Sequence, residues 1–219
     1  MKKSISFISF CLLVFLTFEH LNAQTFKLGL FTGYGSSAFE NFDDNAGTIP
    51  AGVQALLSLD KLQFGSIDLG AEFGYSVVPF TFELQQQAQQ QVIKVADWKI
   101  KQMVIAALVK IKFLKKSTVH PFVRVGAGLY SGGSNVEYTA EAKQLAQQQN
   151  VTLNDEEINF ESAFGFNAGA GTDIQISKTA AIFAEFVYHI VSRKPEGATE
   201  SNGANNWAVQ VGVLFGLGK

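Results

Sequence analysis

A histidine and a serine three positions apart are the residues whose types could support nucleophilic chemistry in this chain. Between Tyr188 and Ser192, the imidazole of His189 could act as the base that activates the Ser192 hydroxyl. In a β-strand, however, residues i and i+3 point to opposite faces, so this pair requires a bulge or the end of the strand. The alternative is an interior histidine that is hydrogen-bonded to Glu185 or to another neighbour.

Acidic segments are the second candidate for chemistry, because carboxylates bind divalent cations. The run Asp43-Asp44-Asn45-Ala46-Gly47 lacks the alternate-residue ligand spacing of a calcium loop, so a solvated acidic surface is favoured. The single cysteine, Cys11, leaves no partner for a disulfide or a zinc cluster. We therefore expect no catalytic residue, no cofactor and no metal site. The acidic residues lie in two segments, 37–49 (Glu40, Asp43, Asp44) and 132–160 (Glu137, Glu141, Asp155, Glu156, Glu157).

The composition is that of a chain that buries a core. Of the 219 residues, 47% are hydrophobic and 16% are charged, which is enough apolar surface for one domain. Lys and Arg number 17 against 19 Asp and Glu, so no basic surface exists for a nucleic-acid backbone, and nucleic-acid binding is excluded. Gly and Phe each occur 20 times, a pairing that indicates β-structure under a steric constraint.

The first 23 residues have the pattern of a secretory signal peptide. Lys2 and Lys3 precede an apolar run from Ile5 to Phe18, and the small residue Ala23 follows at the place of cleavage. A membrane anchor is the alternative, but the run is shorter than the about 20 apolar residues of a spanning helix. We expect residues 1–23 to be removed and residues 24–219 to form one exported domain.

The elements that must position the charged residues are strands, because apolar and polar residues alternate with a period of two. No later apolar run is long enough for a spanning helix, and the connections between the runs are alternately long and short. Such a meander places the long loops at one end of a barrel and the short turns at the other. Eight runs show the alternation: 26–36, 50–59, 63–77, 98–114, 119–131, 161–174, 180–192 and 205–217.

Glycine indicates which face of the strands is inside. The glycines share a face with the charged residues, and a narrow eight-stranded barrel needs small residues in its interior. The apolar face then faces lipid, although a soluble lipocalin-like barrel or sandwich would show the same alternation. Aromatic residues near the run ends are typical of interfacial girdles. These are Tyr34, Tyr75, Trp98, Phe113, Tyr130, Phe164, Tyr188, Trp207 and Phe215.

This assignment places four basic and four acidic side chains in the interior, where buried charges must be paired. We expect an ion-paired, plugged lumen in which these residues hold the barrel together. The alternative for the same residues is a path for protons or ions. The eight are Lys27, Asp68, Glu72, Lys110, Lys112, Arg124, Asp173 and Glu185.

Three segments carry a family resemblance: 120–128 (HPFVRVGAG), 164–171 (FGFNAGAG) and 182–188 (IFAEFVY). Their order and spacing resemble the small outer-membrane protein β-barrel domain family of the OmpX, OmpW and PorT type. The resemblance implies an all-β, eight-stranded antiparallel up-and-down transmembrane barrel in the outer membrane of a Gram-negative bacterium. The C-terminal residues Gln210, Gly212, Phe215 and Leu217 resemble the last-strand signal that the barrel-insertion machinery recognises.

The family does not imply one activity. We expect a non-enzymatic structural or interaction role, with outer-membrane lipid and lipopolysaccharide around the barrel and an envelope or extracellular protein partner at loops 78–97 and 132–160. Gln-rich pieces in these loops, Leu84 to Gln91 and Ala140 to Gln149, predict two short helices that pack together as a cap. The alternatives are a porin-like conduit for small apolar solutes or ions and, through His189, an enzyme similar to the lipid A deacylases.

Overall fold

The computed structural model of the chain describes residues 25–39, 46–59, 62–86, 91–114, 116–194, 196–197, 199 and 202–217. Eight strands and one short helix account for most of this part. The expected signal peptide, its cleavage site and Cys11 lie outside the described residues. No described helix is both long and apolar enough to cross a membrane.

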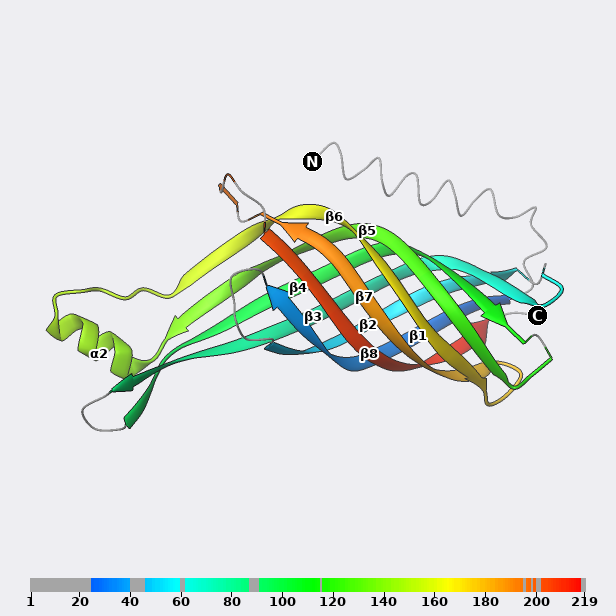
Figure 1. Cartoon of the computed structure of the whole chain (residues 1–219), viewed down its shortest axis with the longest axis horizontal. Coiled ribbons are helices and arrows are strands. Elements are labelled where there is room, and N and C mark those ends of the chain that lie inside the picture. The colour runs from blue at the N-terminus through cyan, green and yellow to red at the C-terminus, as the bar shows by residue number, and fades with distance from the viewer. Residues whose placement is uncertain are drawn as a thin grey trace.

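The strands form one closed antiparallel ring in chain order (Figure 1). The last strand pairs with the first, from Phe26↔Leu217 to Phe39↔Ala204, and this pairing closes the wall. The eight-stranded up-and-down barrel that the alternation predicts is confirmed. The strands are β1 (Thr25–Phe39), β2 (Ala46–Leu59), β3 (Gly65–Gln86), β4 (Gln91–Phe113), β5 (Val119–Tyr138), β6 (Glu156–Gln175), β7 (Ala180–Arg193) and β8 (Asn202–Leu217).

The two ends of the barrel differ, as the alternating connections predict. The short turns between β2 and β3, β4 and β5, and β6 and β7 lie at one end, together with both ends of the described chain (Figure 1). We call this the turn end. At the opposite end, strands β3 to β6 continue past the ring and carry helix α2 (Ala140–Gln148). We call this projecting part, formed by residues 79–86, 91–99, 132–148 and 156–163, the outer extension.

The prediction of a loop over 78–97 with a helix from Leu84 to Gln91 is wrong. Strands β3 and β4 contain 22 and 23 residues and pair continuously to Gln86↔Gln91, with one register shift between Phe82 and Glu83. Glutamine has a good helix propensity, but β-formers on both sides of this piece favour strand pairing, and tertiary context overrides a weak propensity. The second predicted helix is present as α2. Therefore, in the described part, strand β4 and not another helix lies beside α2.

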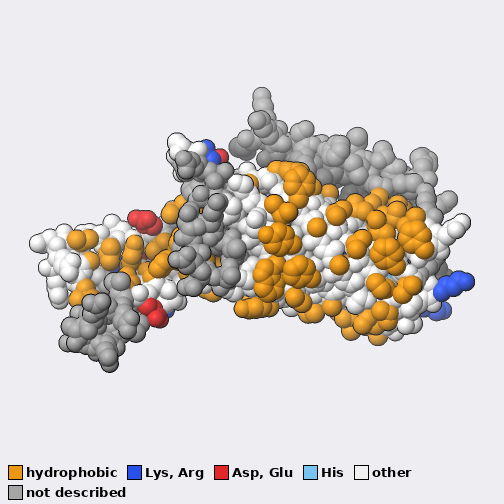
Figure 2. All heavy atoms as spheres, in the orientation of Figure 1, with side chains coloured by type: hydrophobic (Ala, Val, Ile, Leu, Met, Phe, Trp, Pro, Cys, Tyr) orange, Lys and Arg blue, Asp and Glu red, His pale blue; other side chains and the backbone are white. Residues whose placement is uncertain are grey.

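The charged and glycine-bearing face is inside the barrel, and the apolar face is outside. Phe31, Leu56, Leu108, Phe183 and Leu214 form an apolar cluster in the interior. Along the strands, the residues between the interior positions are exposed and mostly apolar, and Figure 2 shows their side chains on the outside of the barrel. An apolar surface of this extent marks contact with lipid or a partner, and not with water.

Seven of the nine predicted girdle aromatics are exposed on this outer face. Tyr130 is a correction, because its side chain is fully buried in the lumen. Trp98 also departs from the prediction, since it lies in the outer extension against Phe80 and Phe82. Tyr130 lies an even number of residues from Arg124 on β5, and Trp98 lies an even number of residues from Lys110 on β4. Each therefore shares a strand face with an interior charge, whereas the prediction rested on its position near the end of a run. The seven are Tyr34, Tyr75, Phe113, Phe164, Tyr188, Trp207 and Phe215.

Candidate functional site

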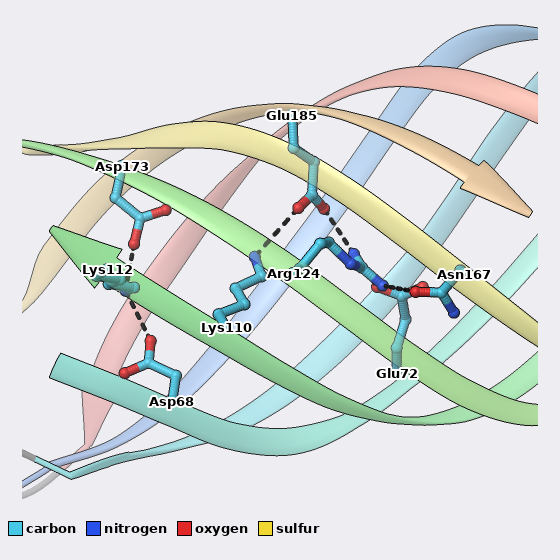
Figure 3. Close-up of polar contacts among 8 residues, drawn as sticks. All are labelled: Asp68, Glu72, Lys110, Lys112, Arg124, Asn167, Asp173 and Glu185. Atoms are coloured by element: carbon cyan, nitrogen blue, oxygen red, sulfur yellow. Dashed lines mark hydrogen bonds and ion pairs between the residues drawn. The ribbon is translucent and has the colours of Figure 1, made fainter.

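The structure buries seven of the eight predicted interior charges in the lumen, where they form two groups (Figure 3). The eighth, Lys27, is partly exposed in the wall of the lumen beside Asp68. In the group nearer the turn end, the Lys112 ammonium lies between the carboxylates of Asp68, at 2.7 Å, and Asp173. Asp68 also accepts a hydrogen bond of 2.5 Å from the Ser58 hydroxyl and lies 3.7 Å from the Lys27 ammonium. One lysine therefore bridges carboxylates from β3 and β6 across the inside of the barrel.

The second group is centred on Arg124 (Figure 3). Its Nη1 donates to Glu72 Oε2 at 2.8 Å and to Glu185 Oε1 at 2.9 Å, and its Nη2 donates to Asn167 Oδ1 at 3.1 Å. Lys110 Nζ lies 3.4 Å from the other oxygen of Glu185. The guanidinium therefore connects β3, β6 and β7 through fully buried contacts. Charge-assisted bonds of this kind are the strong ones in a protein interior.

Aromatic rings complete the environment of Lys110. Its ammonium lies 4.5 Å from the ring centre of Phe122 and 4.7 Å from that of Phe183, within the range of a cation–π interaction. Both rings lie over glycines: a Cβ on Gly171 would be 2.7 Å from Phe122, and one on Gly212 would be 2.5 Å from Phe183. The interior glycines thus make the space that the large side chains fill.

A hydrogen-bonded chain continues from Arg124 toward the outer extension, and sequence reasoning did not find it. Asn167 Nδ2 lies 3.5 Å from Tyr130 Oη, which lies 2.9 Å from His189 Nδ1. His189 is an interior histidine, and its Nδ1 has Tyr130 as a hydrogen-bond partner. Ser192 is exposed on the opposite face of β7, so the two residues do not form a nucleophilic pair.

The interior residues separate two cavities. A cavity of about 250 Å³ at the turn end is lined by Lys27, Lys112 and Asp173, among others. A cavity of about 30 Å³ nearer the outer extension is lined by residues that include Glu72 and His189. The side chains of Lys110, Arg124 and Glu185 line neither cavity and occupy the space between them, with the apolar cluster around Phe183.

A family model described as the outer membrane protein beta-barrel domain matches residues 8–215. The chain belongs to this family. The match extends over nearly all of the sequence, and it agrees with the closed ring and the apolar outer wall. Membership places the barrel in the outer membrane of a Gram-negative cell. Among curated protein sequences, none matches this chain significantly.

Several solved outer-membrane proteins are similar in structure to this outer-membrane barrel. Neisserial surface protein A has 13% identity and a TM-score of 0.50, and the match covers 87% of this chain and 96% of that one. Ail of Yersinia pestis, in complex with a heparin analogue, has 13% identity and a TM-score of 0.47, covering 87% and 99%. OprG of Pseudomonas aeruginosa has 14% identity and a TM-score of 0.46, covering 90% and 97%. At these identities the likeness concerns the fold alone.

The residues of the expected insertion signal lie on β8 of the outer-membrane barrel. Gln210 is buried in the lumen, where it lies opposite Glu185 in the β7–β8 register. Gly212 faces the lumen against Phe183. Phe215 and Leu217 are exposed on the lipid-facing side. The four residues therefore alternate between two environments, with the polar and small ones inside and the apolar ones outside.

The outer extension of the barrel carries exposed ion pairs and one anchored helix. Lys94 lies 2.7 Å from Asp97, and Thr139 accepts a hydrogen bond from Ala142 N at the start of α2. Beyond the helix, Asp155 accepts from Lys143 Nζ and from Tyr138 N, each at 2.9 Å. The hydrogen bond from Lys143, together with that backbone N–H, holds the pKa of Asp155 below its usual value. This carboxylate connects α2 to the end of β5.

Proposed function

We propose that this outer-membrane barrel is a non-enzymatic protein that acts through its outer extension, while its lumen stays closed. The single observation that carries this proposal is the outer extension itself, a sheet that continues past the ring. Its first strand, β3, pairs with β2 only as far as Ile49↔Val77, although β3 continues to Gln86. No described strand covers that edge of residues 78–86. Backbone groups on an open edge are available to another chain.

The side chains of the outer extension support contact with a basic protein partner. Helix α2 buries Ala142 and Ala146 and exposes Leu145, and Val151 is exposed after it. An apolar side chain on a projecting helix is available for burial in an interface. Several acidic side chains nearby are exposed and form no ion pair with a described residue, which favours a cationic partner. These are Glu83, Glu141, Glu156 and Glu157.

The remaining parts of the proposal concern location and assembly. We expect residues 1–23 to direct export and to be cleaved. The lipid-facing wall would contact membrane lipid and lipopolysaccharide, and Gln210, Gly212, Phe215 and Leu217 would present β8 to the barrel-insertion machinery.

Site-specific photo-crosslinking in the intact outer membrane tests the interaction role. A photoreactive residue at Leu145 should give a discrete protein adduct, because that side chain leaves the barrel on α2. The matched control is Phe166, which is exposed on the lipid-facing wall and should give lipid adducts only. Triple substitution of Glu141, Glu156 and Glu157 by Gln should reduce the adduct at position 145. The same adducts at both positions, or none at Leu145, would contradict the proposal.

The conduit is the second candidate, and the cavity at the turn end is the observation in its favour. The ion pairs around Arg124 lie beyond that cavity, so we expect no solute flow in liposome swelling and no steady conductance in planar bilayers.

The third candidate, lipid modification at His189, is tested by mass analysis of lipid A with and without the protein. If the wild-type protein alters the acyl chains of lipid A and the His189→Gln variant does not, the protein is an enzyme and the proposed function is contradicted.

A further inference from the structure

The cavity of about 250 Å³ at the turn end has both charge signs in its wall, and the proposed role of the outer extension does not use it. It lies at the opposite end of the barrel from α2. In outer-membrane barrels the short turns face the periplasm, so this cavity is open to periplasmic solutes. Its wall includes Lys27, Lys112, Asp173, Lys178, Ala181 and Leu214.

Asp173 offers an acceptor that the barrel itself does not use. Its Oδ2 forms the ion pair with Lys112, but its Oδ1 is buried and has no hydrogen-bond partner among the described residues. Asp173 belongs to the wall of the cavity and its side chain is only 4% exposed, so the unpaired oxygen lies buried beside the cavity. Leaving a buried charged acceptor unpaired is unfavourable, and a donor in the cavity would relieve that cost.

Lys27 offers the complementary group. Its ammonium has one described ion pair, the 3.7 Å contact with Asp68, and 24% of its side chain is exposed. Lys112, by contrast, is held between two carboxylates and is nearly buried. Lys27 can therefore turn toward an acceptor in the cavity without breaking the bridge that Lys112 makes. The exposed Lys178 adds a second positive charge to the wall.

We propose that this cavity binds a small zwitterion, an amino acid or a dipeptide. The ammonium group of the ligand donates to Asp173 Oδ1, and its carboxylate accepts from Lys27. Small apolar side chains of the ligand lie against Ala181 and Leu214. The volume supports this size, because sites for drug-sized ligands begin at about 300 Å³. The wall carries three lysines and one aspartate, so several cations face the carboxylate of the ligand and Asp173 alone faces its ammonium group.

Isothermal titration of the full barrel in detergent micelles tests this site, with alanyl-alanine as the probe. Two derivatives separate its charges: N-acetyl-alanyl-alanine lacks the ammonium group, and alanyl-alanine methyl ester lacks the carboxylate. We expect the dipeptide to bind at least about tenfold more tightly than either derivative, because each lacks one charge-assisted contact. Equal binding of the acetylated form would show a plain anion site and would overturn the proposal, as would no binding at millimolar dipeptide.

Substitutions test whether the dipeptide binds in the cavity at the turn end. Lys27→Met removes the carboxylate contact and leaves the Lys112 bridge in place, so the barrel should fold and the affinity should fall at least about tenfold. The matched control is Lys99→Met, because Lys99 pairs with Glu137 in the outer extension, far from the cavity. We expect no change in affinity for the control. Unchanged binding by Lys27→Met would overturn the assignment, and photo-crosslinking at Leu145 would be unaffected by either result.

Discussion

The hydroxyl of Tyr130 on β5 lies 2.9 Å from Nδ1 of His189 on β7, and the two rings meet edge to face with centroids 5.8 Å apart. The contact crosses the lumen between strands that are not neighbours in the sheet. It joins the polar chain through Asn167 to the apolar cluster of Val104, Ala106, Tyr130, Val191 and Ala204. Tyr130 is thus a packing residue and a hydrogen-bonding residue at once.

Removal of the Tyr130 hydroxyl should destabilise the barrel by about 1–2 kcal/mol, because the Tyr130→Phe variant leaves the buried His189 without this partner. Urea unfolding in lipid vesicles, followed by tryptophan fluorescence, measures the loss. Tyr188→Phe is the control, since Tyr188 is partly exposed on the outer wall. Equal unfolding midpoints for wild type and Tyr130→Phe would show that the hydrogen bond makes no net contribution.

Substitution of Arg124 should have a larger effect. Arg124→Met leaves two buried carboxylates, Glu72 and Glu185, without their shared partner, and loss of one side of a buried pair costs about 3–5 kcal/mol. The same unfolding measurement detects this change. Lys194→Met removes the exposed contact with Glu161 and should cost less than about 1 kcal/mol. Similar losses for the two variants would contradict the assigned difference in burial.

A compensating pair tests the packing of the lumen. A Cβ on Gly74 would lie 2.8 Å from Cγ1 of Val104 and would meet no backbone atom so closely. Gly74→Ala should therefore destabilise the barrel by about 1–3 kcal/mol through overpacking. In the Gly74→Ala, Val104→Ala double variant, the shortened partner should recover part of that loss. A double-mutant cycle with additive free energies of unfolding would show that the two sites do not touch.

The Lys143–Asp155 contact should be lost in acid and should stay intact near neutral pH. Because the pKa of Asp155 is lowered from 3.8, its contribution to local stability is complete above that value and is lost as the pH falls through the lower, folded-state pKa. The amide proton of Tyr138, which donates to this carboxylate, reports the change by NMR. We expect a titration midpoint below 3.8 in the wild type and at a higher pH in Lys143→Met. A wild-type midpoint at or above 3.8 would refute the assignment.

The closed wall should be visible on a gel. The pairing of β1 with β8 leaves no edge around the ring, so a sample from the outer-membrane fraction should migrate differently before and after boiling in detergent. A protein found in the soluble periplasm with no such shift would reverse the assignment of the two faces, and the apolar face would then be a core.

The alternation of side chains between the two faces of each strand accounts for most of what could be predicted from the sequence. Since side chains alternate between two faces, identifying Arg124 as interior also places Phe122 and Tyr130 inside, and only the aromatic character of Tyr130 suggested a girdle position instead. Parity does not give the partners. Which carboxylates reach Arg124 depends on the stagger between strands around the ring, and Glu72 and Glu185 come from β3 and β7, on either side of β5 in the chain. Local propensity also failed at Leu84, where cross-strand pairing decided the structure.

The charges of the lumen also make an incomplete ring unfavourable. Strands β1 to β6 bring four interior cations, Lys27, Lys110, Lys112 and Arg124, but only three interior carboxylates, Asp68, Glu72 and Asp173. The fourth carboxylate, Glu185, lies on β7. A sheet that lacks β7 therefore carries an excess positive charge on the face that lines the lumen. Release of such a sheet into the bilayer would leave a charge without its partner, which is unfavourable.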